Sequence, residues 1–154
     1  MEIEDIIKER SVVASLKATS KKQALTELAS LAAERTGLPE REIFDVLLER
    51  ERLGTTGVGS GIAIPHGKLP GLDGIFGCFA RLEEPVDFDS VDGQPVDLVF
   101  LLLAPETAGA DHLKALARIS RLLRNAASCE KLRGAATTEA LDDLLTRDKQ
   151  SRAA

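Results

Sequence analysis

The two histidines of the chain, His66 and His112, are the side chains best suited to chemistry near neutral pH. A neutral imidazole, with an ordinary pKa of ~6.5, acts as a nucleophile, an acid or a base. His66 stands between Pro65 and Gly67, at the mouth of a glycine-dense loop. Because proline fixes the backbone and glycine allows a close approach, we expect this ring to be displayed for function. A structural loop histidine is the alternative.

His112 directly follows Asp111 at the predicted start of a helix. Free N–H groups and the helix dipole at such a position favour a neutral ring and attract an anion, for example a phosphoryl group. A surface histidine near a helix end is the alternative. We expect the neighbouring Asp111 to cap the helix.

Familiar phosphate and metal motifs are absent from the glycine-dense stretch, residues 54–61. It has neither the G-x-x-x-x-G-K-[ST] of a P-loop nor the G-x-G-x-x-G of a dinucleotide site, and Ser60 lies in G-S-G rather than in a nucleophile elbow. The histidines and the two cysteines lack metal-ligand spacing. We therefore expect neither a metal nor a bound cofactor.

A covalent intermediate on histidine is the chemistry that remains. A ring nitrogen that attacks phosphorus needs cations and backbone N–H donors around the phosphoryl oxygens. Arg50 and Lys68 are candidate cations near the loop, whereas we expect Arg52 to be a solvated helix charge. The loop offers candidate N–H donors at Gly57, Gly59 and Gly61.

Composition restricts the class of protein. The chain has 154 residues, 44% hydrophobic and 29% charged, with a net charge of −5, as expected of one globular domain rather than a nucleic-acid binder. No apolar run reaches the ~20 residues that span a bilayer, and the N-terminus lacks the features of a secretion signal. We expect a cytoplasmic protein without membrane insertion, and without disulfides because it has only two cysteines.

Apolar patterning predicts the elements that position these residues. Strands are predicted over 11–16, 75–82 and 96–103, the last of them central and buried on both faces, with Asp92-Gly93 marking a chain reversal before it. Residues 54–61 are predicted to be a loop. Helices are predicted over 20–37, 39–52, 111–125, 128–133 and 138–145.

The helices have predicted ends and buried faces. Ser20 and Gln23 match a capping box, and Gly37 matches a helix C-cap. The buried face predicted for the helix over 111–125 consists of Leu113, Leu116, Ala117, Ile119, Leu122 and Leu123. Alternation of helices and strands predicts a layered α/β fold, in a single domain over 1–154 with its core at about 11–146.

Three segments of the chain resemble one family. Residues 48–69, with the run Gly57-Val-Gly-Ser-Gly-Ile-Ala-Ile-Pro-His66-Gly-Lys68, are similar to the active-site segment of fructose/mannitol-type enzyme IIA proteins of the bacterial phosphotransferase system. They are closer still to its nitrogen-regulatory branch. Residues 92–100 resemble the family's central strand and preceding turn, and 112–116 its helix with a second histidine. The resemblance extends from about Ser11 to Leu145.

The resemblance implies a fold and a set of roles. The fold is a three-layer α/β/α sandwich with a mixed β-sheet. His66 matches the phosphoacceptor, modified on Nε2, and His112 matches the histidine beside it, which helps to hold the phosphoryl group. Arg50 matches the active-site arginine, and Lys68 stands where the nitrogen branch usually has lysine. The donor is an HPr-type phosphocarrier, and phosphoenolpyruvate is the ultimate source. The output is regulatory, toward targets such as potassium transport systems or sensor kinases.

Some details depart from the family pattern or leave alternatives. Ser60 stands where the nitrogen branch often has asparagine, and Pro70-Gly71 where acidic residues are common. A sugar-specific enzyme IIA that feeds a IIB domain is one alternative function, and an interaction module that is never phosphorylated is another. We expect an apolar ring around His66 to be the docking surface, formed by Val58, Ile62, Ile64 and Leu69, with core packing as the alternative for Ile62 and Ile64.

Overall fold

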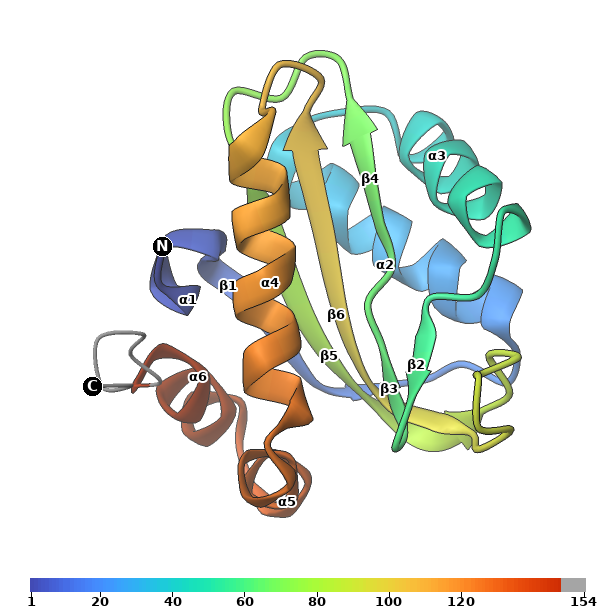
Figure 1. Cartoon of the computed structure of the whole chain (residues 1–154), viewed down its shortest axis with the longest axis vertical. Coiled ribbons are helices and arrows are strands. Elements are labelled where there is room, and N and C mark those ends of the chain that lie inside the picture. Colours follow the sequence, from blue (N-terminus) through green and yellow to red (C-terminus); the bar gives the residue numbers. More distant parts are fainter. Residues whose placement is uncertain (148–154) are drawn as a thin grey trace.

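A mixed six-stranded sheet lies between two layers of helices in the computed structural model, which describes residues 1–147 (Figure 1). The strands are β1 (Ile7–Leu16), β2 (Gly57–Gly59), β3 (Ile62–Ala63), β4 (His66–Leu69), β5 (Phe76–Val86) and β6 (Val96–Pro105). The helices are α1 (Ile3–Ile6), α2 (Lys21–Thr36), α3 (Glu40–Arg52), α4 (Ala110–Arg124), α5 (Ala126–Gly134) and α6 (Thr138–Arg147). The α/β/α prediction is confirmed.

Strand β6 is the centre of the sheet, as its unbroken apolar run predicts. The strand order is β1-β5-β6-β3-β2, and β4 also pairs with β6. β5 is antiparallel to β6, while β3 and β4 are parallel to it. The reversal at Asp92-Gly93, where Gly93 has φ 74°, joins β5 to β6. The predicted turn and central strand are thus confirmed.

Each face of the sheet has its own hydrophobic core. Alternate residues of β6 point to opposite faces, so Val99 and Leu101 pack with α2 and α3, while Leu98 and Phe100 pack with α1, α4, α5 and α6. Cys78 is fully buried in the first core, as predicted for a small apolar residue.

Local sequence signals explain the helix ends. The Ser20 hydroxyl accepts a hydrogen bond from the N–H of Gln23 at 3.1 Å, and Gly37 ends α2 with φ 78°. The Gln23 carboxamide accepts from the N–H of Thr19 at 2.7 Å, one residue before the position that a capping box predicts. Pro39 is the N-cap of α3.

Several boundaries differ from the sequence predictions. Residues before Ser11 form α1 and the beginning of β1. The stretch 54–61 is not wholly a loop, since Gly57–Gly59 forms β2, and His66 begins strand β4 rather than lying in a loop. Pairing with distant β3 and β6 orders these segments despite their composition.

Helix α4 is rotated relative to the predicted buried face. Leu113 is 67% exposed and Ala117 is exposed, whereas His112 and Ala115 are buried. Asp111 does not cap the helix, because Gly109 is the N-cap and no side chain makes the capping hydrogen bond. No helix within residues 1–147 combines the length and the apolar character that crossing a membrane would need.

Candidate active site

His66 opens strand β4, at the open edge of the sheet. In the parallel register it lies opposite Leu102 of β6, and the β6 partner of Leu69 is Pro105. Because strand residues alternate, Gly67 and Leu69 face α3, and His66 faces the α4 side together with Lys68. The ring is half-buried. It is therefore both anchored in the sheet and open to a partner.

Two hydrogen bonds determine the tautomer of His66. Its Nδ1 lies 2.9 Å from the carbonyl oxygen of Ile64, which can only accept, so Nδ1 carries the proton. Its Nε2 accepts from Nε–H of Arg50 at 3.3 Å. Arg50 also donates from Nη1 to the carbonyl of Gly54 at 2.9 Å, at the end of α3. The Nε2 lone pair therefore faces a positioned cation.

His112 lies beside His66, in the first turn of α4. The ring centroids are 5.8 Å apart with an interplanar angle of 52°. His112 is 9% exposed, and its Nδ1 is buried without a hydrogen-bond partner among the described residues. The structure thus brings together three residues that the sequence predicted, from α3, β4 and α4.

Both rings are shifted toward the neutral form. Burial is the main cause that lowers the pKa of His66, and Arg50 lowers it further, against opposing effects of the Ile64 carbonyl and Glu51. Burial also lowers the pKa of His112, followed by the charges of His66 and Lys68. Two neutral imidazoles at pH 7 are a nucleophile and a hydrogen-bonding neighbour for an incoming electrophile.

The other predicted cations have separate surroundings. Lys68 is exposed on β4, two residues beyond His66 and on the same side of the strand. Arg52 pairs with Glu49 at 3.1 Å, and both side chains are about two-thirds exposed, at 66% and 67%. The prediction that Arg52 is a solvated helix charge is confirmed.

The three predicted loop glycines lie in and beside the β2–β3 hairpin. Gly57 packs so tightly on Ser90 that an added Cβ would overlap the hydroxyl. Gly61 has φ 81°, and its carbonyl accepts from the N–H groups of Asp97 and Leu98, both at 3.0 Å. Gly59 has φ 104°. The close packing at Gly57 and the positive φ angles at Gly59 and Gly61 explain why glycine stands at these positions of the β2–β3 hairpin, which precedes His66.

The predicted apolar docking ring is wrong for most of its members. Ile62, Ile64 and Leu69 are 2%, 5% and 0% exposed, because all three pack in the hydrophobic cores. Core packing, the alternative for Ile62 and Ile64, is therefore what the structure shows. Val58 alone of the four is exposed, at 54%. Ile64 contributes to the site through its carbonyl, which accepts from His66.

Sequence reasoning missed a buried ion pair next to Arg50. The Glu51 side chain is 4% exposed and pairs with Lys21 of α2 at 2.9 Å. It also accepts from the N–H of Thr56 at 3.1 Å and from the Thr56 hydroxyl. This network connects α2, the end of α3 and the segment before β2. A glutamate in the run Glu49-Arg-Glu-Arg looks solvated in sequence, so only the fold reveals it.

A close approach of α3 to β4 carries Arg50 to the histidine. A Cβ added at Gly67 would overlap Cγ1 of Val46. Glycine at this position therefore allows contact between the helix and the strand. Among the residues whose side chains the structure describes, no three His, Cys, Asp or Glu side chains are grouped to hold a metal ion.

Comparison with known proteins identifies the family of the chain. The chain matches the family model for the phosphoenolpyruvate-dependent sugar phosphotransferase system, EIIA 2, over residues 5–148. It is similar to a nitrogen regulatory protein from Bradyrhizobium diazoefficiens, with 62% identity over 145 residues, 94% of this chain and 95% of that protein. It is 47% identical over 125 residues to a nitrogen regulatory protein from Pseudomonas aeruginosa, covering 79% of this chain and 80% of that protein.

A solved structure gives the same result. The crystal structure of nitrogen regulatory protein IIA-Ntr from Neisseria meningitidis superposes with a TM-score of 0.87 at 36% identity, covering 92% of this chain and 97% of that one. The family resemblance and the fold are thus confirmed. The chain belongs to the EIIA 2 family of the phosphoenolpyruvate-dependent sugar phosphotransferase system, as a phosphotransferase component.

Proposed function

We propose that the protein is a phosphohistidine carrier in which His66 accepts the phosphoryl group. The observation that carries the proposal is the orientation of His66: Nδ1–H donates to Ile64 and the Nε2 lone pair is directed at Arg50. Nε2 attacks phosphorus in line, and the new N–P bond forms as the N–P bond to the donor's imidazole breaks. The electron pair of the broken bond returns to the donor ring.

The surrounding residues stabilise the moving charge. Arg50 exchanges its hydrogen bond to Nε2 for one to a phosphoryl oxygen, and His112 donates to another. Because Nε2 becomes bonded to phosphorus while Nδ1 keeps its proton, the ring gains positive character, which the Ile64 carbonyl stabilises. Lys68 adds a positive charge at the rim.

The donor in this proposal is an HPr-type phosphocarrier, loaded from phosphoenolpyruvate by upstream enzymes in the cytoplasm. No metal or cofactor takes part. The output is regulatory: the free and phosphorylated forms bind different targets, with potassium transport systems and sensor kinases as the class. Similarity to nitrogen regulatory proteins over most of the chain supports this direction. A phosphoryl group adds about −1.5 to −2 charges, enough to change an interface.

Intact-mass spectrometry tests the proposal directly. The protein is mixed with phosphoenolpyruvate, enzyme I and an HPr-type carrier, beside His66→Ala and His112→Ala variants. We expect one phosphoryl group on the wild type, labile in acid and stable in base, and none on His66→Ala. Phosphorylation of the His66→Ala variant would contradict the proposal. Absence of phosphorylation of the wild type with every carrier tried would also contradict it, and would favour an interaction module.

The sugar-specific alternative predicts a different acceptor. A sugar-specific enzyme IIA passes its phosphate rapidly to a IIB domain, whereas the regulatory carrier does not. The loaded protein is therefore mixed with purified fructose-type and mannitol-type IIB domains. Rapid loss of the phosphoryl group to either domain identifies a sugar pathway and contradicts the regulatory assignment.

A further inference from the structure

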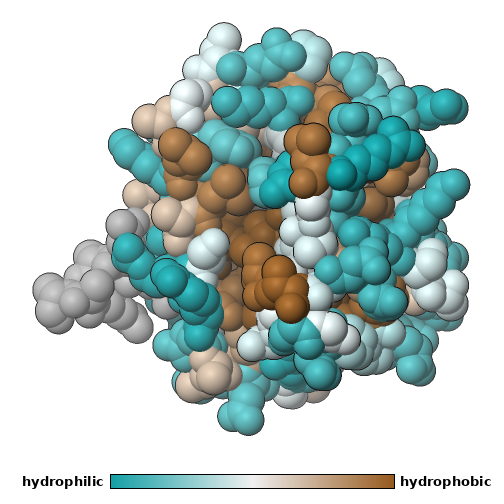
Figure 2. All heavy atoms as spheres, turned by 45° about the vertical axis from the view of Figure 1, so that its right-hand side comes forward, coloured by the Kyte–Doolittle hydropathy of each residue, from teal (hydrophilic) through white to brown (hydrophobic). Residues whose placement is uncertain are grey.

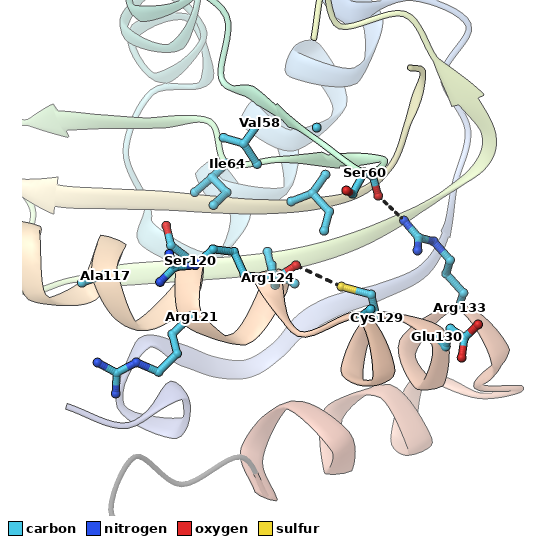
Figure 3. A pocket seen from close by; sticks show the side chains of 14 residues that line it. Val58, Ser60, Ile64, Ala117, Ser120, Arg121, Arg124, Cys129, Glu130 and Arg133 are labelled. Carbon is cyan, nitrogen blue, oxygen red and sulfur yellow. Dashed lines mark hydrogen bonds between the residues drawn. The ribbon is translucent and has the colours of Figure 1, made fainter. Parts of the chain in front are cut away.

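A groove separate from the histidine pair lies between the β2–β3 hairpin and the α4–α5 helices (Figure 3). Its volume is about 700 Å³. Its lining includes neither histidine nor Arg50. Volumes of roughly 300–1,000 Å³ are typical of sites for small organic ligands.

The floor of the groove is hydrophobic. Figure 2 shows hydrophobic side chains gathered in a hollow on one face, surrounded by hydrophilic ones. The groove is lined by aliphatic side chains from β2, from β3 and the residues just after it, and from α4: Val58, Ile62, Ile64 and Leu123. Val58 is 54% exposed although its neighbours are buried. An apolar ligand body placed here removes the exposed side chain of Val58 from water and covers the small exposed parts of Ile62, Ile64 and Leu123.

The charged residues of the groove differ in their availability. Arg133 is engaged by Asp97 at 2.8 Å and by the carbonyl of Ser60 at 2.9 Å. The Arg121 side chain points away from the strands in Figure 3. Arg124 lies along the side of α4 that faces the strands. No residue whose side chain the structure describes forms an ion pair with it.

A hydroxyl lies next to this free cation. Ser120 precedes Arg124 by one helical turn and therefore shares its face of α4. Arginine binds a carboxylate through paired N–H groups, and a neighbouring hydroxyl can donate a further hydrogen bond to the same carboxylate. One guanidinium and one hydroxyl are therefore suited to a ligand with a single carboxylate. A second negative charge is not favoured in the groove, because Arg133 is already paired, the Arg121 side chain points away from the strands, and Glu130 lines the same groove.

We propose that this groove binds a small organic monocarboxylate with an aliphatic body. The aliphatic part lies on Val58, Ile62 and Ile64, and the carboxylate pairs with Arg124 and Ser120. The site involves no covalent step and does not depend on phosphorylation of His66. It nevertheless adjoins the histidine pair, since Ile64 lines the groove while its carbonyl holds His66, and α4 carries both Arg124 and His112.

Titration with sodium octanoate, followed by backbone amide NMR of the full chain, tests the proposal. We expect saturable shifts confined to the groove, with a dissociation constant on the order of 0.1–1 mM. Arg124→Met should weaken binding by about tenfold, because a charge-assisted hydrogen bond is lost. Arg121→Met is the matched control on the same helix and should bind as the wild type does. Acetate, which lacks the body, should not bind.

Three results would overturn the proposal. The first is binding of uncharged octanamide as tightly as octanoate, which would indicate an apolar surface for a protein segment rather than a carboxylate site. The second is equal weakening by Arg121→Met and Arg124→Met. The third is a shift of the same amides on protein dilution without octanoate, which would indicate that a second copy covers the groove. Val58→Ser provides an independent variant and should weaken octanoate binding without changing the selectivity against octanamide.

Discussion

The Nε–H of Arg50 lies 3.3 Å from Nε2 of His66, so a cation faces the nucleophilic lone pair before any phosphate is present. Arg50 is itself held by the Gly54 carbonyl at the end of α3. The geometry keeps Nε2 unprotonated and places a donor where phosphoryl oxygens would arrive. A preorganised donor of this kind stabilises charge without reorganisation during the reaction.

Replacement of Arg50 by glutamine should slow phosphoryl loading of His66 by about 10²–10³-fold, because one positioned cationic donor is lost. Single-turnover transfer from a phosphorylated HPr-type carrier measures the rate. Arg52→Gln is the matched control, since Arg52 is in the same turn and pairs only with Glu49 among the described residues. Equal slowing by both variants would mean that general surface charge, not the contact with His66, determines the rate.

His112→Gln should slow loading by about 10²-fold while leaving the phosphorylation site unchanged. The ring lies 5.8 Å from that of His66, and its Nδ1 has no partner within the described chain. A glutamine retains a donor but not the ring position. The measurement is the loading rate, with peptide mapping of the product. Phosphate on residue 112 in the wild type would reverse the assigned roles.

Both histidines should titrate below the ordinary value of ~6.5, as burial lowers each pKa. As pH falls below ~6.5, the unfolded chain takes up these protons first. Stability contributed by the neutral rings is thus present above that pH and is lost as pH falls through the folded-state pKa values. NMR titration of the ring protons and urea unfolding at several pH values measure both effects. His112→Gln should flatten the decline; a ring midpoint above ~7 would contradict the expectation.

Lys21→Met should destabilise the protein by about 3 kcal/mol, because it leaves the Glu51 carboxylate buried without its cation. Lys22→Met, an exposed neighbour on α2, is the control and should change stability by less than about 0.5 kcal/mol. Urea unfolding gives both values. If the double variant Lys21→Met/Glu51→Met recovers most of the loss, the cost arises from the uncompensated charge, as proposed.

Gly67→Ala should reduce both stability and phosphoryl loading, because the new methyl group overlaps Val46 and pushes α3, with Arg50, away from β4. The double variant Gly67→Ala/Val46→Ala removes the overlapping carbon and should recover part of the loading rate. Gly74→Ala, where nothing lies within 4 Å, is the control. A Gly67→Ala variant with normal loading would show that the close approach does not position Arg50.

Features of the fold encoded locally were predictable from the sequence. The Ser20 cap, the Gly37 end of α2 and the apolar run of β6 each depend on a few neighbouring residues. The position of His66 in a strand could not be predicted in this way, because it arises from pairing with Leu102, which is distant in the sequence. The exposure of Leu113 depends on how α4 is rotated against the sheet, which an apolar pattern alone does not determine.

The candidate site follows the same division. Its two histidines and Arg50 stand out by residue type and by the family resemblance, and the fold brings them together. The burial of Glu51 with Lys21 depends on contact between α2 and α3. The predicted docking ring was wrong because Ile62 and Ile64 pack in the hydrophobic core, and a short apolar run does not reveal whether its side chains are buried.

The separation of the hydrophobic interior into two cores has a thermodynamic consequence. Arg50 belongs to a helix that packs on one core, and His112 to a helix that packs on the other. A group on His66 held by both side chains strengthens the connection between these two helical layers, which pack on opposite faces of the sheet. Sub-global opening of either layer then breaks those contacts, so the loaded chain unfolds more cooperatively than the free one, and its amide hydrogens exchange more slowly in both layers at once.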